Sequence, residues 1–184
     1  LVRSRGLGDV YKRQVHNFEN ASSNYVADKD QASYAASREK YDRDNIKDIK
    51  KSVKDGLKAP GLDGYTGKKV DPSKLEADHV TSLKRINSTK KNHLAFNTGD
   101  GFDRLAEGAN SPENLVATHR DINNPKRAKD LIEFANEVVD GETNADRLGM
   151  DPERMRAAKE RSEKHLNKTA DRAILVKQLS LIHI

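Results

Sequence analysis

The sequence contains no cysteine and no tryptophan, and its 184 residues include only four phenylalanines and five tyrosines. The absence of cysteine excludes disulfide frameworks, zinc ribbons and thiol catalysis. So few aromatic side chains argue against a platform on which the bases of a single strand stack. A run of about 18 apolar residues is also missing, so we expect neither a membrane-spanning helix nor a membrane partner.

Charged and hydrophobic residues each make up 34% of the chain, and the mean hydropathy is -0.91. This composition approaches that of disordered chains, but a net charge of +5 is too small to force disorder. We therefore expect one α+β domain of ordinary size, in which a small hydrophobic core is combined with long solvated helices.

Both ends of the chain resemble translated sequencing-library adapters. Residues Asp9–Gln14 match one strand of a transposase mosaic end, and Leu179–Ile184 match the complementary strand. We expect residues 1–14 and 179–184 to be artefacts, so that residues 15–178 are a fragment of a longer protein. Four basic residues and one acidic residue lie in the first 14, so the net charge falls from +5 to +2 without the two ends. The charge balance therefore says little about nucleic acid.

The rest of the chain divides into three segments. Residues 15–60 are predicted to be helical, with a helix over about 31–57 that ends at Ala59-Pro60-Gly61. Residues 61–140 combine short strands, turns and helices. Residues 141–178 contain a helix that is predicted to begin at Asp151-Pro152 and to reach about Ala173. Because this last helix is polar nearly all round, we expect it to bridge parts of the protein or to bind a protein partner.

The central segment alternates element types. We expect a short hairpin over 62–70, strands over 75–82 and 115–118, and one or two helices over 83–107. A further helix is predicted to begin with Asn124 as its cap and Pro125 in its first turn, and to end at Gly141.

Chemistry-bearing residues of the central segment follow a recognisable order. An Asp78-His79 pair is uninformative alone, but Asn114-Leu115, Asn123 and Lys126 follow it across the second strand and the predicted helix. This pattern resembles the HNH endonuclease family, also called ββα-metal or His-Me finger nucleases, of the phage or mobile-element type. The supporting phrases are Thr66-Gly67-Lys68-Lys69-Val70 and Asn110-Ser111-Pro112-Glu113-Asn114-Leu115, and the resemblance covers about residues 62–140.

The chain departs from that family in three respects. His119 and Ile122 stand where zinc-stapled relatives have cysteine, which predicts a zinc-free version. Ser82 replaces a common proline, and the segment 83–107 makes the gap between the two strands longer than usual.

The resemblance implies a small ββα-metal core and a metal-dependent hydrolysis of phosphodiester bonds. His79 would be the general base, since an unperturbed imidazole titrates near neutral pH. Asn114 would serve catalysis by hydrogen bonding to the backbone that orients His79. Asp78 and Asn123 would hold a divalent metal, and their hard oxygen ligands suit Mg²⁺.

Basic residues of the predicted helix would contact the substrate. Lys126, Arg127 and Lys129 lie where they could touch flanking phosphates. We expect DNA as the substrate, with RNA as the alternative, and a cytoplasmic location in a bacterium or a phage-infected cell.

Simpler interpretations stay open at this point. Asp78-His79 fits a surface pair, Asn114 and Asn123 fit ordinary turn or helix caps, and residues 126–129 fit a solvated helix face. At the level of function, the alternatives are a non-catalytic nucleic-acid-binding module that kept the finger, and a structural part of a phage or mobile-element protein.

Overall fold

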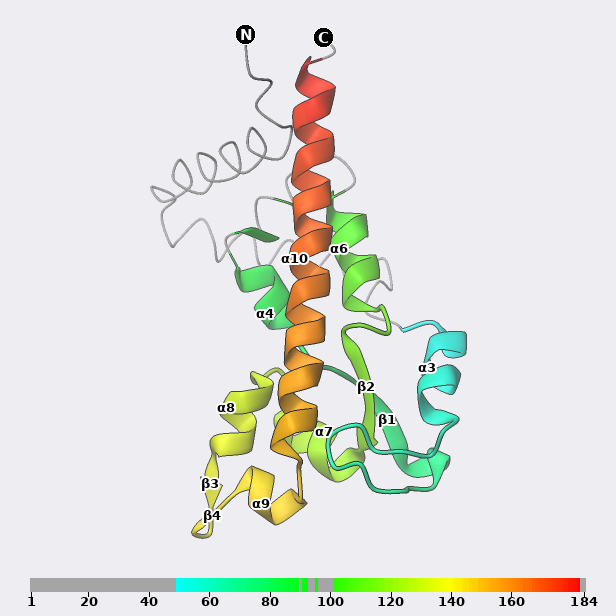
Figure 1. The fold of residues 1–184 in the computed structure, drawn as a ribbon, viewed down its shortest axis with the longest axis vertical. Helices are drawn as coiled ribbons and strands as arrows, with labels where there is room; N and C mark the ends of the chain where they lie inside the picture. The colour runs from blue at the N-terminus through cyan, green and yellow to red at the C-terminus, as the bar shows by residue number, and fades with distance from the viewer. Residues whose placement is uncertain (1–48, 90, 93–94, 96–100, 183–184) are drawn as a thin grey trace, which may run out of the picture.

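The structure is a computed structural model, and it describes residues 49–89, 91–92, 95 and 101–182. These residues form the expected α+β fold (Figure 1). The helices are α3 (Lys51–Lys58), α4 (Leu83–Ser88), α6 (Gly101–Ala109), α7 (Arg120–Lys126), α8 (Leu131–Asn136), α9 (Asn144–Leu148) and α10 (Pro152–Ile182). The strands are β1 (Leu75–His79), β2 (Leu115–His119), β3 (Val138–Val139) and β4 (Glu142–Thr143). None of the helices in the described residues is long and apolar enough to cross a membrane.

Strands β1 and β2 pair antiparallel, and α7 follows β2 directly and packs on both strands. Leu75 lies opposite His119 and His79 lies opposite Leu115 in this register. Both expected strands are therefore confirmed, although β1 ends at His79 because Ser82 caps the following helix α4. The loop before β1 forms the expected hairpin only as a single bridge between Leu62 and Lys69.

The single helix expected from Asn124 to Gly141 is a wrong prediction. Asn124 and Pro125 lie inside α7, whose N-cap is His119. The chain then leaves the helical conformation at Arg127, which has a φ of 49°. A second helix, α8, begins after Asp130, whose side chain accepts hydrogen bonds from the two backbone amides of residues 132 and 133. A good cap at Asp130 thus outweighs the cap and proline signals read at residues 124–125.

Helix α10 runs along most of the molecule and packs on the other elements (Figure 1). One face of it enters all three hydrophobic clusters of the described residues. The buried positions recur at helical spacing: Met155, Ala158, Ser162, Leu166, Ala170 and Ala173. This helix therefore bridges parts of the protein, which is one of its two expected roles, because α6 and α8 both pack on it. Binding of a protein partner stays a prediction.

Two helices differ in extent from their predictions near the ends of the described chain. Most of the helix expected over 31–57 lies outside the described residues, and α3 is its last part; α3 ends before Ala59 as expected. Helix α10 begins at Pro152 as predicted but continues to Ile182, nine residues past Ala173 and into the adapter-like segment. The adapter-like residues 1–14 lie outside the described residues.

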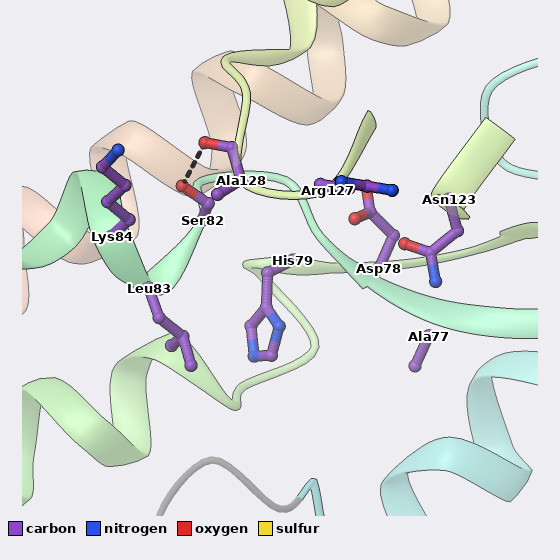
Figure 2. Close-up of a pocket in the computed structure, with 9 residues that line it drawn as sticks. All are labelled: Ala77, Asp78, His79, Ser82, Leu83, Lys84, Asn123, Arg127 and Ala128. Carbon is purple, nitrogen blue, oxygen red and sulfur yellow. Dashed lines mark hydrogen bonds between the residues drawn. The ribbon is translucent and has the colours of Figure 1, made fainter. Parts of the chain in front are cut away.

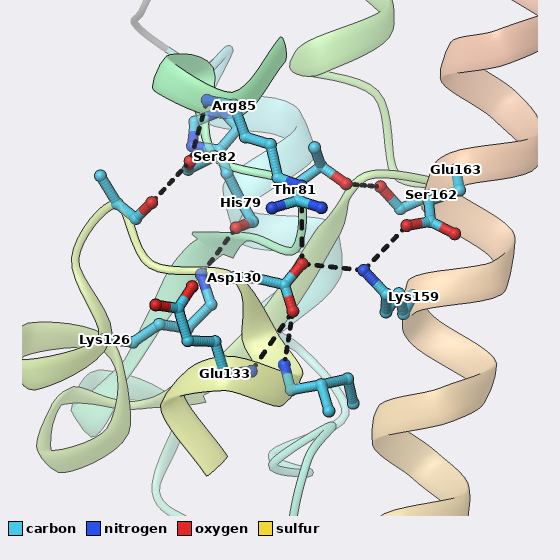
Figure 3. A network of polar contacts seen from close by, with 12 residues as sticks. His79, Thr81, Ser82, Arg85, Lys126, Asp130, Glu133, Lys159, Ser162 and Glu163 are labelled. Atoms are coloured by element: carbon cyan, nitrogen blue, oxygen red, sulfur yellow. Dashed lines mark hydrogen bonds and ion pairs between the residues drawn. The ribbon is translucent and has the colours of Figure 1, made fainter. Parts of the chain in front are cut away.

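Asp130 connects α8, α10 and the start of α4 (Figure 3). Lys159 donates a hydrogen bond to its carboxylate at 2.8 Å, and Arg85 lies 3.6 Å from the same oxygen. Partial burial would raise the pKa of Asp130, but the hydrogen bonds and the charge of Lys159 outweigh it and lower the pKa from 3.8. The ionised form is therefore the one that stabilises the fold.

We predict that Asp130→Asn lowers the free energy of unfolding at pH 7 by about 1 kcal/mol, because Asn keeps the helix cap and loses the charge. A lowered native pKa makes this contribution complete above pH 3.8 and lost as the pH falls further. The difference between wild type and variant should therefore shrink in acid, measured by urea unfolding across pH. Asp140→Asn, at an exposed turn position, is the control and should change little. A difference for Asp130→Asn that is constant with pH would contradict the assignment.

Candidate active site

A pocket of about 270 Å³ lies where β1 ends, between the start of α4 and the turn after α7 (Figure 2). Four of the seven predicted site residues line it: Asp78, His79, Asn123 and Arg127. Of the other three, Asn114 and Lys126 lie buried and hydrogen bonded to the chain around residues 78–81, and Lys129 points elsewhere. The sequence motif thus converges on one place in the fold.

The imidazole of His79 is held by a hydrogen bond at Nε2, the ring nitrogen farther from the backbone. Nε2 lies 2.9 Å from the amide oxygen of Asn110, so this nitrogen donates and carries the proton. The lone pair then belongs to Nδ1, which lies on the Asn123 side of the ring in Figure 2. Burial lowers the pKa of His79 below 6.5, so the imidazole is neutral and can accept a proton at neutral pH. This is the state that a general base requires.

Asn114 makes the backbone hydrogen bonds that the resemblance implies. Its amide oxygen accepts from the backbone N–H of Thr81 at 2.9 Å, and its amide nitrogen donates to the carbonyls of Thr81 at 3.1 Å and Ala109 at 2.9 Å. The side chain of Asn114 is fully buried. It therefore fixes the chain two residues after His79.

The same brace is tied to α10 by a hydroxyl. Ser162 donates to the amide oxygen of Asn114 at 2.5 Å and lies 2.7 Å from the hydroxyl of Thr81. Because Ser162 and Asn114 are both fully buried, the hydrogen bond between them is shielded from water. The long helix thus takes part in holding the end of β1.

Asp78 forms a buried ion pair instead of pointing freely into the pocket. One carboxylate oxygen accepts a hydrogen bond from Lys126 at 3.0 Å, and the other accepts one from the hydroxyl of Tyr65 at 2.7 Å. Lys126 also donates to the backbone carbonyl of His79 at 2.9 Å. Burial raises the pKa of Asp78 above 3.8, and the charge of Lys126 offsets part of that rise. Burial likewise raises the pKa of Tyr65 well above 10.0, so the phenol stays protonated as a donor.

Asn123 lies within α7, not immediately before a helix as expected. Its amide nitrogen donates to the carboxylate of Glu76 at 2.8 Å. Figure 2 shows its amide oxygen on the side of Asp78. The contact with Glu76 ties the amide of Asn123 to β1 and fixes its orientation.

Asp78 and Asn123 do not fit the role of magnesium ligands as the structure holds them. In the part of the chain that is described, no three His, Cys, Asp or Glu side chains are grouped to hold a metal ion. Both oxygens of Asp78 accept hydrogen bonds, and an ammonium already neutralises the carboxylate. The amide of Asn123 alone adds one neutral oxygen, whereas Mg²⁺ requires a six-ligand shell and charge compensation. We therefore route no chemical step through a metal at Asp78.

The three predicted phosphate contacts differ in position. The prediction for Lys126 is corrected, because its ammonium is fully buried against Asp78 and cannot reach a flanking phosphate. Lys129 pairs with Glu137 at 2.6 Å and lies over the ring of Phe134, away from the pocket. Arg127 is exposed and lines the pocket, so it alone of the three can contact a substrate there.

Some residues of the site gave no usable signal in the sequence. Tyr65 lies in a glycine-rich loop 13 residues before its partner Asp78, and Ser162 lies 48 residues after Asn114. Only the helical spacing of the buried positions along α10 could have marked Ser162 as buried. Lys84, which also lines the pocket, follows the cap of α4.

Comparison of the chain with protein-family models, with curated proteins and with solved structures finds no match in any of the three. The resemblance to HNH nucleases therefore rests on the sequence motif alone.

The backbone of Arg127 is strained. Its φ of 49° and ψ of -121° place it in the first central position of a tight turn closed by the Lys129 amide and the Lys126 carbonyl at 3.0 Å. Glycine is preferred at this position because side chains are disfavoured at positive φ. A cost of roughly 1–3 kcal/mol for such a conformation must be offset by the surrounding structure.

We predict that Arg127→Gly raises the free energy of unfolding by roughly 1 kcal/mol while it weakens binding of duplex DNA. The matched variant Arg127→Ala keeps the strained backbone and loses the guanidinium. It should therefore bind DNA as weakly as Arg127→Gly without being stabilised. Thermal unfolding and fluorescence anisotropy at fixed salt measure the two effects. Unchanged DNA binding in both variants would show that Arg127 does not contact the substrate.

Proposed function

We propose that this protein is an HNH-type nuclease that hydrolyses phosphodiester bonds in DNA, with His79 as the general base. The observation that carries the proposal is the setting of His79. The imidazole stands at the end of β1 with its Nε2 proton held by Asn110, its Nδ1 lone pair available and a pocket in front of it. The succession of β1, β2 and α7 supports the same assignment.

The chemistry assigned to the chain's own residues is simple. The oxygen of a water molecule forms a bond to phosphorus while Nδ1 of His79 accepts one of its protons. The bond between phosphorus and the leaving sugar oxygen breaks, and that oxygen takes a proton from solvent. Arg127 supplies positive charge at the pocket for the phosphoryl oxygens, where charge develops.

Positioning residues keep the base in place. Asn114 fixes Thr81, and Lys126 fixes the carbonyl of His79 itself. Because the two clamps hold the chain at His79 and two residues later, β1 cannot end in a different direction without breaking one of them.

A second function has a specific observation in its favour. The carboxylate of Asp78, which the resemblance implies as a metal ligand, is paired with an ammonium. This arrangement favours a non-catalytic nucleic-acid-binding module that retains the finger. Such a module would bind DNA through Arg127 and its neighbours but would not turn substrate over.

We predict that His79→Ala lowers the rate of DNA cleavage by roughly 10²–10⁴-fold and leaves DNA affinity unchanged within about twofold. Nicking of supercoiled plasmid in the presence of Mg²⁺ gives the rate, and anisotropy gives the affinity. His165→Ala, on α10, is the matched control and should retain full activity.

The outcomes separate the candidates. Cleavage that persists in His79→Ala would remove the general base from the proposal. Binding without any cleavage by the wild type, at any divalent cation concentration, would favour the binding module. A faster reaction on RNA of the same sequence would change the substrate and leave the role of His79 intact.

A further inference from the structure

The ammonium of Lys126 is buried in the interior and paired with a carboxylate. Its side chain is 0% exposed, and that of Asp78 is 4% exposed. A lysine is almost never fully buried unless it is paired. Here the pair is made from two elements that are far apart in sequence, since Lys126 is the last residue of α7 and Asp78 lies in β1.

The contacts of Lys126 reproduce what a bound cation would do. Its ammonium binds one oxygen of Asp78 at 3.0 Å and the backbone carbonyl of His79 at 2.9 Å. The second oxygen of Asp78 accepts a hydrogen bond from the hydroxyl of Tyr65 at 2.7 Å. The negative charge of the carboxylate is therefore neutralised from inside the protein.

A divalent cation at Asp78 would have to share the carboxylate with this ammonium. Because the ammonium and the metal ion are both positively charged, they would repel each other strongly at the short distance that sharing one carboxylate imposes. The ammonium of Lys126 has no lone pair and cannot be a metal ligand, and the O–H proton of Tyr65 points at Asp78. The pair and a metal at Asp78 are thus competitors.

We propose that Lys126 is the built-in cation of the site: its ammonium takes the position at Asp78 that a divalent metal ion would otherwise occupy, so that Asp78 binds no metal in this protein. The inference rests on the proposed function only in treating Asp78 as part of the site. It predicts that neutralising Lys126 creates a cation site where the wild type has none.

The test compares metal binding by the full chain in the wild type and two variants, and Tyr65→Phe, added to the forms that emit, is the control for the emission. Lys126→Met removes the ammonium and keeps a long apolar stem, and Asp78→Asn/Lys126→Met removes both charges as the matched control. Mg²⁺ is titrated in thermal unfolding, since a ligand that binds only the native state increases the folding constant by the factor 1 + [L]/Kd. Tb³⁺, which also prefers hard oxygen ligands, is titrated while tyrosine-sensitised emission is followed, because Tyr65 touches Asp78.

We expect Lys126→Met to melt below the wild type and to be rescued by Mg²⁺, with about an elevenfold gain in folding constant at ten times its Kd. The wild type and the double variant should show no such gain, and only Lys126→Met should give Tb³⁺ emission that Tyr65→Phe abolishes.

Emission from the wild type that disappears in the double variant and in Tyr65→Phe would overturn the proposal, because Asp78 would then bind metal beside Lys126. An equal response of Lys126→Met and the double variant would also overturn it. The wild-type titration decides the matter even if Lys126→Met does not fold. No nucleic acid is present, so the result is independent of whether His79 cleaves DNA.

Discussion

The buried ion pair between Asp78 and Lys126 joins β1 to the end of α7, and the geometry of the site follows from it. Removing one partner of such a pair leaves an uncompensated charge and typically costs 3–5 kcal/mol. The pair is supported by Tyr65 from the preceding loop and extends to the carbonyl of His79. The direction of the imidazole is therefore linked to the same ammonium that neutralises the carboxylate, because Lys126 also donates to the backbone carbonyl of His79.

A second constraint comes from the long helix α10. Its hydroxyl at Ser162 satisfies the buried amide of Asn114, which in turn holds both backbone groups of Thr81. A half-satisfied buried amide would cost about 1–3 kcal/mol for each lost partner. Helix α10, which the sequence indicated as a separate polar segment, thus helps to support the site. The chain just after β1 is held by Asn114 on one side and by Ser162 of α10 on the other.

The sequence indicated the strands, the cap at Asp151 and the convergence of Asp78, His79 and Asn123, because these depend on local pattern and on a motif in fixed order. It misplaced the helix after β2. The local cap signal lies at Asn124, but the structure has two helices there, one capped by His119 and one capped by Asp130. The burial of Lys126 could not be predicted from local sequence either, because a lysine three residues after an asparagine on a helix is ordinarily solvated.

The misplaced helix and the unexpected burial of Lys126 have a common cause, which is the end of α7 before the turn at Arg127. If α7 had continued as one helix through residue 139, Lys126 would lie in its middle and the strained turn at Arg127 would not exist. Ending α7 at Lys126 buries the ammonium against Asp78, and the turn that follows presents Arg127 to the pocket. Non-glycine residues at positive φ persist where the surrounding structure over-determines them. The buried ion pair on one side and the cap of α8 at Asp130 on the other provide that constraint. Adjacent residues therefore differ in role: Lys126 neutralises Asp78 in the interior, and Arg127 takes the strained conformation and faces the pocket.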